Sequence, residues 1–371
     1  MNRHNFSRIT ASFAIAALII CVPVFAESIA QSVRDSIDLC LEMLIPSLFC
    51  MMILSAFAVR TNIMSPLFRP LGFITRYVLR LDPQLTQVLI FGLIGGYPVG
   101  AKLISNLIAG GEITPESGRR MLCFCVNAGP AFLIGAIAIP LYGDIKIGFI
   151  LFGSQLLAAL TIAIVTGLGR CGKIEMMKKS AVKNPNYAKH LVTAVGDIIK
   201  SMSVICGFII IFGAIITILK NTGIIFALTK LLSAAIPNSA AAAVTGFFEI
   251  TAGVAVCKEI PGLASLLTVC AITSFGGLCV HAQIFSIMQN AGNSSLRMRD
   301  FYPARIIYTI LSVIYCYWIT SLSAVNAETF AFLPLPANAR IFAVSPPVSF
   351  MLILLSLCFL TSIKKSTETH P

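Results

Sequence analysis

Charged side chains are scarce in this sequence. Asp, Glu, Lys and Arg together make up 11% of the 371 residues, whereas hydrophobic residues make up 57%. A soluble globular domain carries about 25% charged residues, and a helix needs about 20 apolar residues to cross a bilayer. The sequence therefore excludes a soluble domain and predicts an all-α polytopic membrane protein. Long apolar runs fall near 9–26, 39–59, 121–140, 148–168, 200–220, 263–290, 304–323 and 347–363.

The residue patterns that most enzymes and metalloproteins need are also missing. The chain has four histidines, one of them next to the C-terminus, and no Ser/His/Asp, P-loop or metal-ligand pattern. Cys123 and Cys125 flank one residue, but no second pair stands at zinc-finger spacing. The other cysteines lie almost all in apolar runs, where a thiol behaves as a small hydrophobe. We therefore expect no enzymatic activity, no metal site and no cofactor.

The net charge of +12 is explained by the bilayer rather than by nucleic acid. No basic segment alternates with aromatic residues in a soluble module, so a nucleic-acid partner is not expected. Lysine and arginine collect in the cytoplasmic loops of membrane proteins. The basic segments 60–84 and 169–199, together with Arg297, Arg299 and Arg305, are therefore expected on the cytoplasmic side. This orientation predicts a multi-pass protein with both termini in the cytoplasm.

Two apolar segments are interrupted by glycine and polar residues, namely 85–109 and 240–257. Three full crossings between the two basic loops would place the second loop on the wrong face of the membrane. The conflict disappears if 85–109 enters and leaves on the same face, as a re-entrant hairpin. The same reasoning makes 240–257 a hairpin that enters from the outside. The sequence thus predicts about eight transmembrane helices plus two re-entrant hairpins.

The two halves then share one order of elements with opposite membrane orientation. Each offers a helix, a hairpin and two further helices, which is the pattern of the two inverted-topology repeats of secondary transporters. Residues 1–26 also imitate a signal peptide, but we favour an uncleaved first helix. The expected organisation is an N-terminal helix and external loop (1–38), a first repeat (39–168), a basic cytoplasmic linker (169–199), a second repeat (200–323), and an external loop, last helix and cytoplasmic tail (324–371).

The first hairpin breaks at Gly95, Gly96, Tyr97 and Pro98, with Lys102 about one turn further on. Irregular backbone inside a bilayer is tolerated only where it is buried in protein or lines a wet cavity. A helix that restarts after the break presents free N–H groups and a positive dipole end to a carboxylate or phosphate. We therefore expect the tip to bind an anion. The alternative is a packed kink whose lysine reaches to the membrane interface.

Three more breaks carry polar side chains at corresponding places in the chain. Asn127 stands beside Gly129 and Pro130, and Glu249 and Thr251 lie in the second hairpin. A carboxylate inside a membrane is costly and indicates function, here the binding of a coupling cation or proton or an ion pair with the lysine of the first hairpin. A structural amide between helices is the alternative for the asparagine.

The last break holds His281 and Gln283 inside an apolar helix. A histidine there could relay a proton or contact substrate, and the alternative is a hydrogen-bonded core histidine. Substrate binding is therefore expected of the first hairpin tip together with Asn127, Thr251 and Gln283, and handling of a coupling ion or proton of Glu249 and His281.

The combination GGYPVGAK, NAGPAFLIGA, FEITAG and SFGGLCVHAQ resembles the YlbJ family of sporulation integral membrane proteins, over most of residues 40–320. These proteins carry nucleoside-recognition Gate repeats and are distantly similar to concentrative nucleoside transporters. The resemblance implies a cell-membrane protein of spore-forming Firmicutes that moves dipicolinate from the mother cell toward the forespore. It also matches Gly253, Gly276 and Gly277 in addition to the residues named above.

The functional expectation is a secondary transporter for a small organic anion, coupled to H⁺ or Na⁺. Lys102 and the N–H groups of the first hairpin would bind the carboxylates of a dipicolinate-like substrate. One alternative is a carrier of nucleosides or nucleobases, which need no lysine. Another is a sporulation membrane scaffold without transport activity, which has no need of polar breaks at matching places.

Overall fold

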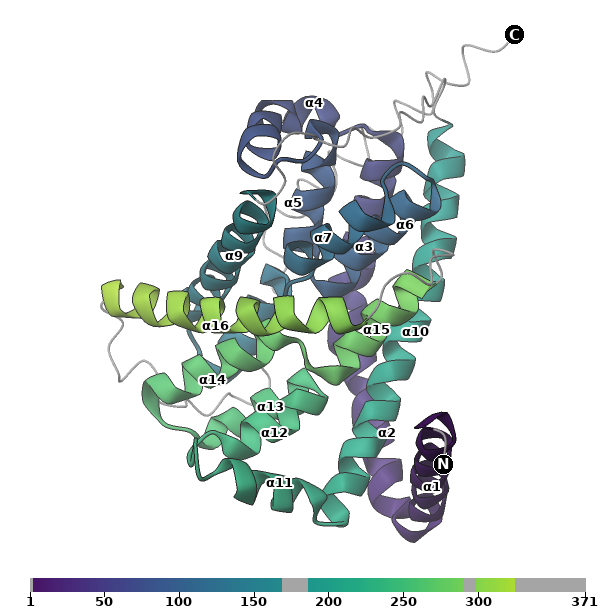
Figure 1. Cartoon of the computed structure of the whole chain (residues 1–371), viewed down its shortest axis with the longest axis vertical. Coiled ribbons are helices and arrows are strands. Elements are labelled where there is room, and N and C mark those ends of the chain that lie inside the picture. Colours follow the sequence, from purple (N-terminus) through teal and green to yellow (C-terminus); the bar gives the residue numbers. More distant parts are fainter. Residues whose placement is uncertain (1–2, 169–185, 290–297, 324–371) are drawn as a thin grey trace. The chain divides into compact units, whose positions relative to one another are not determined.

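The computed structural model describes residues 3–168, 186–289 and 298–323, and every regular element in these three stretches is a helix (Figure 1). The all-α prediction is confirmed for this part of the chain. The first half consists of α1 (Arg3–Val24), α2 (Ala26–Leu39), the π-helical turn η1 (Cys40–Leu44), α3 (Ile45–Thr61), α4 (Ser65–Phe68), the turns η2 (Arg69–Leu71), η3 (Ile74–Val78) and η4 (Pro83–Leu85), α5 (Thr86–Gly95), α6 (Tyr97–Ala109), α7 (Pro115–Cys125), η5 (Ala131–Ala138), α8 (Ile139–Tyr142) and α9 (Ile145–Leu168).

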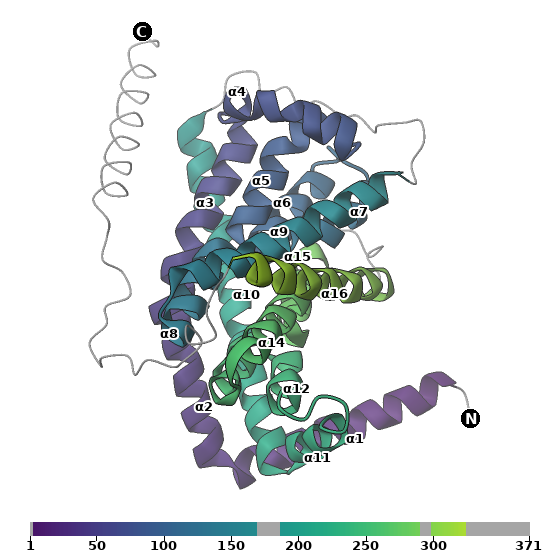
Figure 2. The same ribbon diagram turned by 90° about the vertical axis from the view of Figure 1, so that its left-hand side faces the viewer.

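The second half begins with one long helix, continues with short ones and ends with another long helix. It consists of α10 (Tyr187–Asn221), α11 (Ile224–Leu232), α12 (Ala240–Phe248), α13 (Ile250–Val256), η6 (Cys257–Glu259), α14 (Gly262–Phe275), α15 (Gly277–Gln289) and α16 (Met298–Leu322). Helix α16 crosses and packs against both α9 and α14 (Figure 2). The two halves of the sequence are therefore in direct contact.

The described residues hold four to six candidate spans, whereas the sequence predicts about eight over the whole chain. Four stretches of the described residues are long and apolar enough to cross a membrane: Ile145–Leu168, Tyr187–Asn221, Gly262–Gln289 and Phe301–Leu322. The count rises to 6 if the pairs Ile15–Val24 with Ala26–Leu44 and Leu48–Thr61 with Ser65–Leu71, bent by 97° and 87°, are each one span. The expected span 121–140 is interrupted by a break, and the expected span 347–363 lies outside the described residues.

Two segments expected as loop or linker are helical. Residues 26–39 form α2 instead of an external loop. No glycine or proline interrupts them, Ile29 and Ser36 are buried, and Gln31, Arg34 and Asp38 are exposed. Residues 187–199 form the first part of α10, where the side chain of Asn186 accepts a hydrogen bond from the Lys189 N–H and caps the helix. The other part of the expected linker, 169–185, lies outside the described residues.

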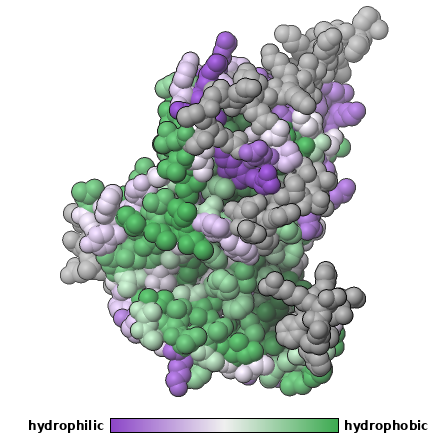
Figure 3. All heavy atoms as spheres, viewed as in Figure 1, coloured by the Kyte–Doolittle hydropathy of each residue, from purple (hydrophilic) through white to green (hydrophobic). Residues whose placement is uncertain are grey.

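The outer surface of the helices is rich in apolar side chains. Large hydrophobic residues of α9, α10 and α16 are exposed, among them Val165, Val192 and Trp318. Figure 3 shows hydrophobic residues over much of one face, with hydrophilic residues gathered toward its upper part. Soluble proteins rarely expose so much contiguous apolar surface. With the apolar spans, this surface places the chain in a membrane.

All four predicted breaks interrupt helices in the structure. Gly96 separates α5 from α6, residues 126–130 separate α7 from η5, Glu249 separates α12 from α13, and Gly276 separates α14 from α15. Gly96 has φ +89°, a conformation that side chains with a Cβ rarely adopt. Helix α5 packs against α6, and α12 packs against α13, so each pair folds back on itself as a hairpin.

Close glycine contacts occur at both hairpins. A Cβ atom added to Gly100 of α6 would lie 2.1 Å from the carbonyl oxygen of Cys125, at the end of the neighbouring helix α7. A Cβ atom added to Gly253 of α13 would lie 2.3 Å from the Cα atom of Gly246 in α12. Atoms cannot approach so closely, so only glycine permits these crossings. The first hairpin therefore packs closely against α7, and the two helices of the second hairpin pack closely against each other.

Candidate functional site

The tips of both hairpins and the breaks that follow them meet around one small cavity. This tip cavity has a volume of about 60 Å³. It is lined by Gly96, Tyr97 and Pro98 of the first hairpin, by Glu249, Ile250 and Thr251 of the second, by Gly129, Phe132, Cys279, Val280 and Gln283 after the two later breaks, and by Leu44, Leu48, Ile205 and Ile209. Six of the predicted site residues, from three separate segments, thus line one cavity.

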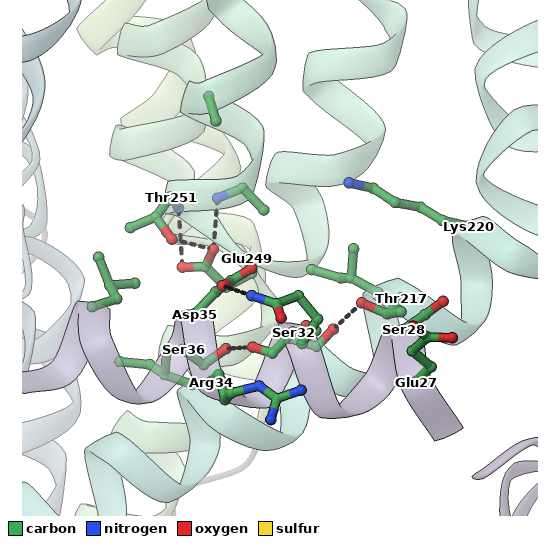
Figure 4. A pocket seen from close by; sticks show the side chains of 17 residues that line it. Glu27, Ser28, Ser32, Arg34, Asp35, Ser36, Thr217, Lys220, Glu249 and Thr251 are labelled. Atoms are coloured by element: carbon green, nitrogen blue, oxygen red, sulfur yellow. Dashed lines mark hydrogen bonds between the residues drawn. The ribbon is translucent and has the colours of Figure 1, made fainter. Parts of the chain in front are cut away.

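A second, larger cavity opens beside the first. This vestibule has a volume of about 800 Å³ and is lined by polar side chains of α2 together with residues of α10 and α13 (Figure 4). Glu249 and Thr251 line both cavities. The vestibule and the tip cavity are therefore neighbours, with these two side chains shared between them.

The sequence interpretation missed the contribution of α2. Its residues Ser28, Ser32 and Ser36 follow each other at intervals of four, and Gln31 and Asp35 do the same on a neighbouring stripe. The Gln31 amide donates to the Asp35 carboxylate at 2.8 Å. Residues four apart share a helix face. The serine spacing could have indicated a polar helix face at a stretch that was interpreted as a loop.

Glu249 closes the N-terminus of α13. Its backbone is extended, and one carboxylate oxygen accepts from the Thr251 N–H at 3.0 Å. The other oxygen accepts from the Thr251 hydroxyl at 2.6 Å and from the Ala252 N–H at 2.7 Å. Such side-chain acceptors satisfy donors that a helix start leaves free. The carboxylate is buried, with 8% of the residue exposed, and these three donors make its burial tolerable.

Lys102 lies away from both cavities. It occupies α6 and interacts electrostatically with Asp197, Arg60 and Lys200. Arg60 of α3 donates to the Asp197 carboxylate of α10 at 2.5 Å. The suggested ion pair between Lys102 and Glu249 is absent from the ion pairs of the described residues. Gly95, also predicted at the tip, is buried at the end of α5 and lines neither cavity.

Asn127 and His281 are buried behind the tip cavity rather than exposed to it. The Asn127 amide donates to the Phe124 carbonyl at 2.7 Å, which bridges the end of α7. The His281 ring is hydrogen-bonded through Nε2 to the Phe275 carbonyl at 2.8 Å. It also packs edge-on against the rings of Phe275 and Phe301, with centroids 4.9 and 5.2 Å away. In this arrangement both side chains support the breaks.

Arg305 is a central residue that the sequence interpretation placed in the cytoplasm. It is 1% exposed and lies within α16. Its guanidinium donates to the Val126 carbonyl at 2.6 Å, to the Ser274 carbonyl, and to the Phe275 carbonyl at 3.4 Å. Those carbonyls end α7 and α14, the helices that precede two of the breaks. An ionisable residue inside an apolar run was the signal that could have identified it.

The Arg305 guanidinium thus donates to the C-terminal carbonyls of both α7 and α14. A helix C-terminus carries roughly half a negative charge, so two of them together balance about one guanidinium. The guanidinium carbon also lies 4.5 Å from the ring centroid of Tyr308, where a cation is attracted to the π face. This explains how an arginine can be buried among the described helices without a carboxylate partner.

Tyr97 connects the first hairpin tip to the same helix end. Its hydroxyl donates to the Thr273 carbonyl of α14. The Gln155 amide of α9 donates to the Thr273 hydroxyl at 2.9 Å. The C-terminal turn of α14 is therefore tied to the first hairpin, to α9 and to α16. Tyr97, which lines the tip cavity, is thus part of a hydrogen-bonded polar network.

Comparison with known proteins agrees with a membrane location. The chain is 23% identical over 312 residues to the sporulation integral membrane protein YlbJ of Bacillus subtilis (strain 168), a match that covers 77% of this chain and 76% of the relative. No family model matches the chain, and no solved structure matches it. The similarity supports the expected resemblance to YlbJ, whereas the similarity to concentrative nucleoside transporters and the Gate repeats stay predictions. The chain is thus a membrane protein similar to YlbJ.

Proposed function

We propose that the chain is a secondary transporter that moves a small organic anion, of the dipicolinate type, across the cell membrane during sporulation. The observation that carries the proposal is the shared wall of the two cavities. Glu249 and Thr251 line both the vestibule and the tip cavity, and they belong to the tip of a broken-helix hairpin. Broken helices at a midplane site are typical of secondary transporters. The Bacillus relative is named as a sporulation integral membrane protein, which supports the link to sporulation.

The proposal includes two inverted repeats, residues 39–168 and 200–323. Each half holds a hairpin followed by a broken helix, α5–α6 with α7–η5 and α12–α13 with α14–α15. In each half the tip of the hairpin and the later break line the tip cavity. Rocking of one half against the other would open this cavity to the two sides in turn.

The vestibule offers cations to an anionic substrate. Arg34 and Lys220 line it, together with the acidic residues Glu27, Asp35 and Glu249. A carboxylate of the substrate could form a charge-assisted hydrogen bond with either cation. A vestibule of about 800 Å³ is within the range of small-molecule sites, about 300–1,000 Å³.

Glu249 is the proposed site of coupling. A dianionic substrate that enters beside a buried carboxylate needs a compensating positive charge. A proton or Na⁺ bound at Glu249 would supply it and would release the donors of Thr251 and Ala252. Substrate and cation would then move together.

A second candidate is a carrier of nucleosides or nucleobases. Among the described residues that line the tip cavity, Glu249 is the one charged side chain, and no cation accompanies it. An uncharged heterocycle could donate N–H groups to this carboxylate and pair with the Gln283 amide, while its ring contacts the aliphatic lining. This candidate needs no role for Lys102.

Uptake by proteoliposomes distinguishes the candidates. Purified protein is reconstituted, and uptake of labelled dipicolinate is measured with unlabelled pyridine dicarboxylates or uridine as competitors. Saturable uptake inhibited by pyridine dicarboxylates supports the anion transporter. Saturable uptake of labelled uridine that pyridine dicarboxylates leave unchanged supports the second candidate. Absence of both activities, with no thermal stabilisation by a panel of metabolites, contradicts transport and favours a membrane scaffold.

A further inference from the structure

The segment between α3 and the first hairpin has an unusual surface. Residues 62–80, here called the arginine platform, contain Arg69, Arg76 and Arg80 and no Asp or Glu. Arg69 and Arg76 are exposed. So are six large hydrophobic side chains, whose exposed fractions are 50% for Ile63, 64% for Leu67, 42% for Leu71, 59% for Phe73, 73% for Tyr77 and 42% for Val78. Apolar and cationic groups therefore alternate on one exposed segment.

The platform runs across the direction of the helix that leads into it. The axis turns by 87° between Leu48–Thr61 and Ser65–Leu71. If Leu48–Thr61 stands across the bilayer, Ser65–Leu71 lies along its surface. The turn is made at Asn62, whose φ of +55° lets α3 end in a left-handed cap. This orientation suits a segment at the boundary between lipid headgroups and hydrocarbon.

We propose that the arginine platform binds the headgroups of anionic phospholipids. Exposed leucine and aromatic rings enter the boundary between headgroups and acyl chains, and arginines beside them attract lipid phosphates. Each basic residue near an anionic membrane surface contributes about 1 kcal/mol, which is about fivefold in affinity. Arg76 also lies over the Tyr77 ring, 5.9 Å from its centroid, and so holds a cation beside an interfacial aromatic side chain.

The platform is tied to the base of the first hairpin. The Thr75 and Thr86 hydroxyls are 2.8 Å apart, and the Gln87 amide of α5 donates to the Asn62 side chain at 2.7 Å. The Phe68 ring meets the Phe91 ring of α5 edge to face, with centroids 5.7 Å apart. Lipid bound at the platform would therefore contact a segment that is hydrogen-bonded to and packed against α5. Anionic lipid anchors the base of this hairpin at the membrane surface.

Tryptophan fluorescence tests the proposal at the platform itself. The chain has one tryptophan, Trp318, so W318F with Y77W leaves a single reporter on the platform. The protein is reconstituted in mixed bilayers, and quenching by brominated phosphatidylglycerol is compared with quenching by brominated phosphatidylcholine. The proposal predicts stronger quenching by the anionic lipid, and it predicts that R69Q/R76Q lowers this preference about fivefold for each arginine.

The matched control is K146Q/K230Q, which removes the same charge from two exposed lysines outside the platform. This variant is expected to retain the preference for the anionic lipid. Equal quenching by both lipids in the reporter protein overturns the proposal. Equal loss of the preference in K146Q/K230Q also overturns it, because the effect would then follow net charge rather than the platform. Both double variants change exposed side chains, and retention of fold is checked by circular dichroism.

Discussion

The guanidinium of Arg305 donates a hydrogen bond of 2.6 Å to the carbonyl oxygen of Val126, which joins the last described helix to the break after α7. The same group donates to the carbonyls of Ser274 and Phe275 at the break after α14. One side chain therefore fixes the ends of two broken helices from the two halves of the chain. The tip cavity depends on both ends keeping their positions.

Arg305→Ala is expected to destabilise the protein by about 3 kcal/mol, because it leaves three buried carbonyls without their donor. Arg305→Lys should fall between this variant and the native protein, since an ammonium cannot reproduce the planar fork of a guanidinium. Thermal unfolding of the purified proteins in detergent measures both effects. Arg76→Ala is the control, because an exposed side chain should change stability by about 0.5 kcal/mol or less. Equal melting temperatures for R305A and R76A would contradict the structural role of Arg305.

Gly253→Ala is expected to open the second hairpin. The added Cβ would overlap the backbone of Gly246, and overpacking of this kind costs about 1–3 kcal/mol. Gly196→Ala and Gly207→Ala in α10 are matched controls, because an added Cβ meets nothing within 4 Å at either position. These two changes should be neutral or stabilising by up to about 1 kcal/mol. Thermal unfolding of all three variants is the measurement. A lower melting temperature for the two α10 variants, with an unchanged one for Gly253→Ala, would contradict the packing of the hairpin.

Lys102→Ala separates the sequence interpretation from the structure. Lys102 lines neither cavity, so its removal should leave the KM of transport within about twofold, whereas Gln283→Ala should raise KM by about tenfold through loss of a hydrogen bond to substrate. Initial uptake rates over a range of substrate concentrations give both values. A large rise in KM for K102A with an unchanged KM for Q283A would return the binding site to the lysine.

Sequence patterns predicted the four helix breaks, because glycine and proline destabilise the interior of a helix and polar side chains are costly inside a membrane. Six of the residues predicted for the site, among them Glu249, Thr251 and Gln283, line the tip cavity, whereas its aliphatic lining was not predicted. The position of Lys102 could not be predicted, since the direction of a side chain depends on how α6 is rotated about its axis. Lys102 follows the break by about one helical turn, but this spacing does not direct its side chain toward the tip cavity.

Arg305 and α2 show a different limit. Lysine and arginine collect in cytoplasmic loops, and a basic residue near the end of an apolar run fits this rule whether its side chain is exposed or buried in the helix bundle. Its burial depends on the free carbonyls of α7 and α14, which come from positions about 180 and 30 residues away in sequence. Helix α2 was interpreted as a loop because its polar side chains made it too hydrophilic for a span. Those side chains face a vestibule that forms only when α10 and α13 lie opposite.

The most direct test of the account is uptake by proteoliposomes that contain Glu249→Gln, compared with Glu259→Gln. Both substitutions remove one carboxylate, but Glu249 stands between the two cavities whereas Glu259 is exposed in the short turn η6. The account predicts that E249Q lowers the rate of coupled uptake by at least about tenfold and removes its dependence on the H⁺ or Na⁺ gradient, while E259Q transports at the native rate. Native uptake with intact gradient dependence in E249Q would contradict it.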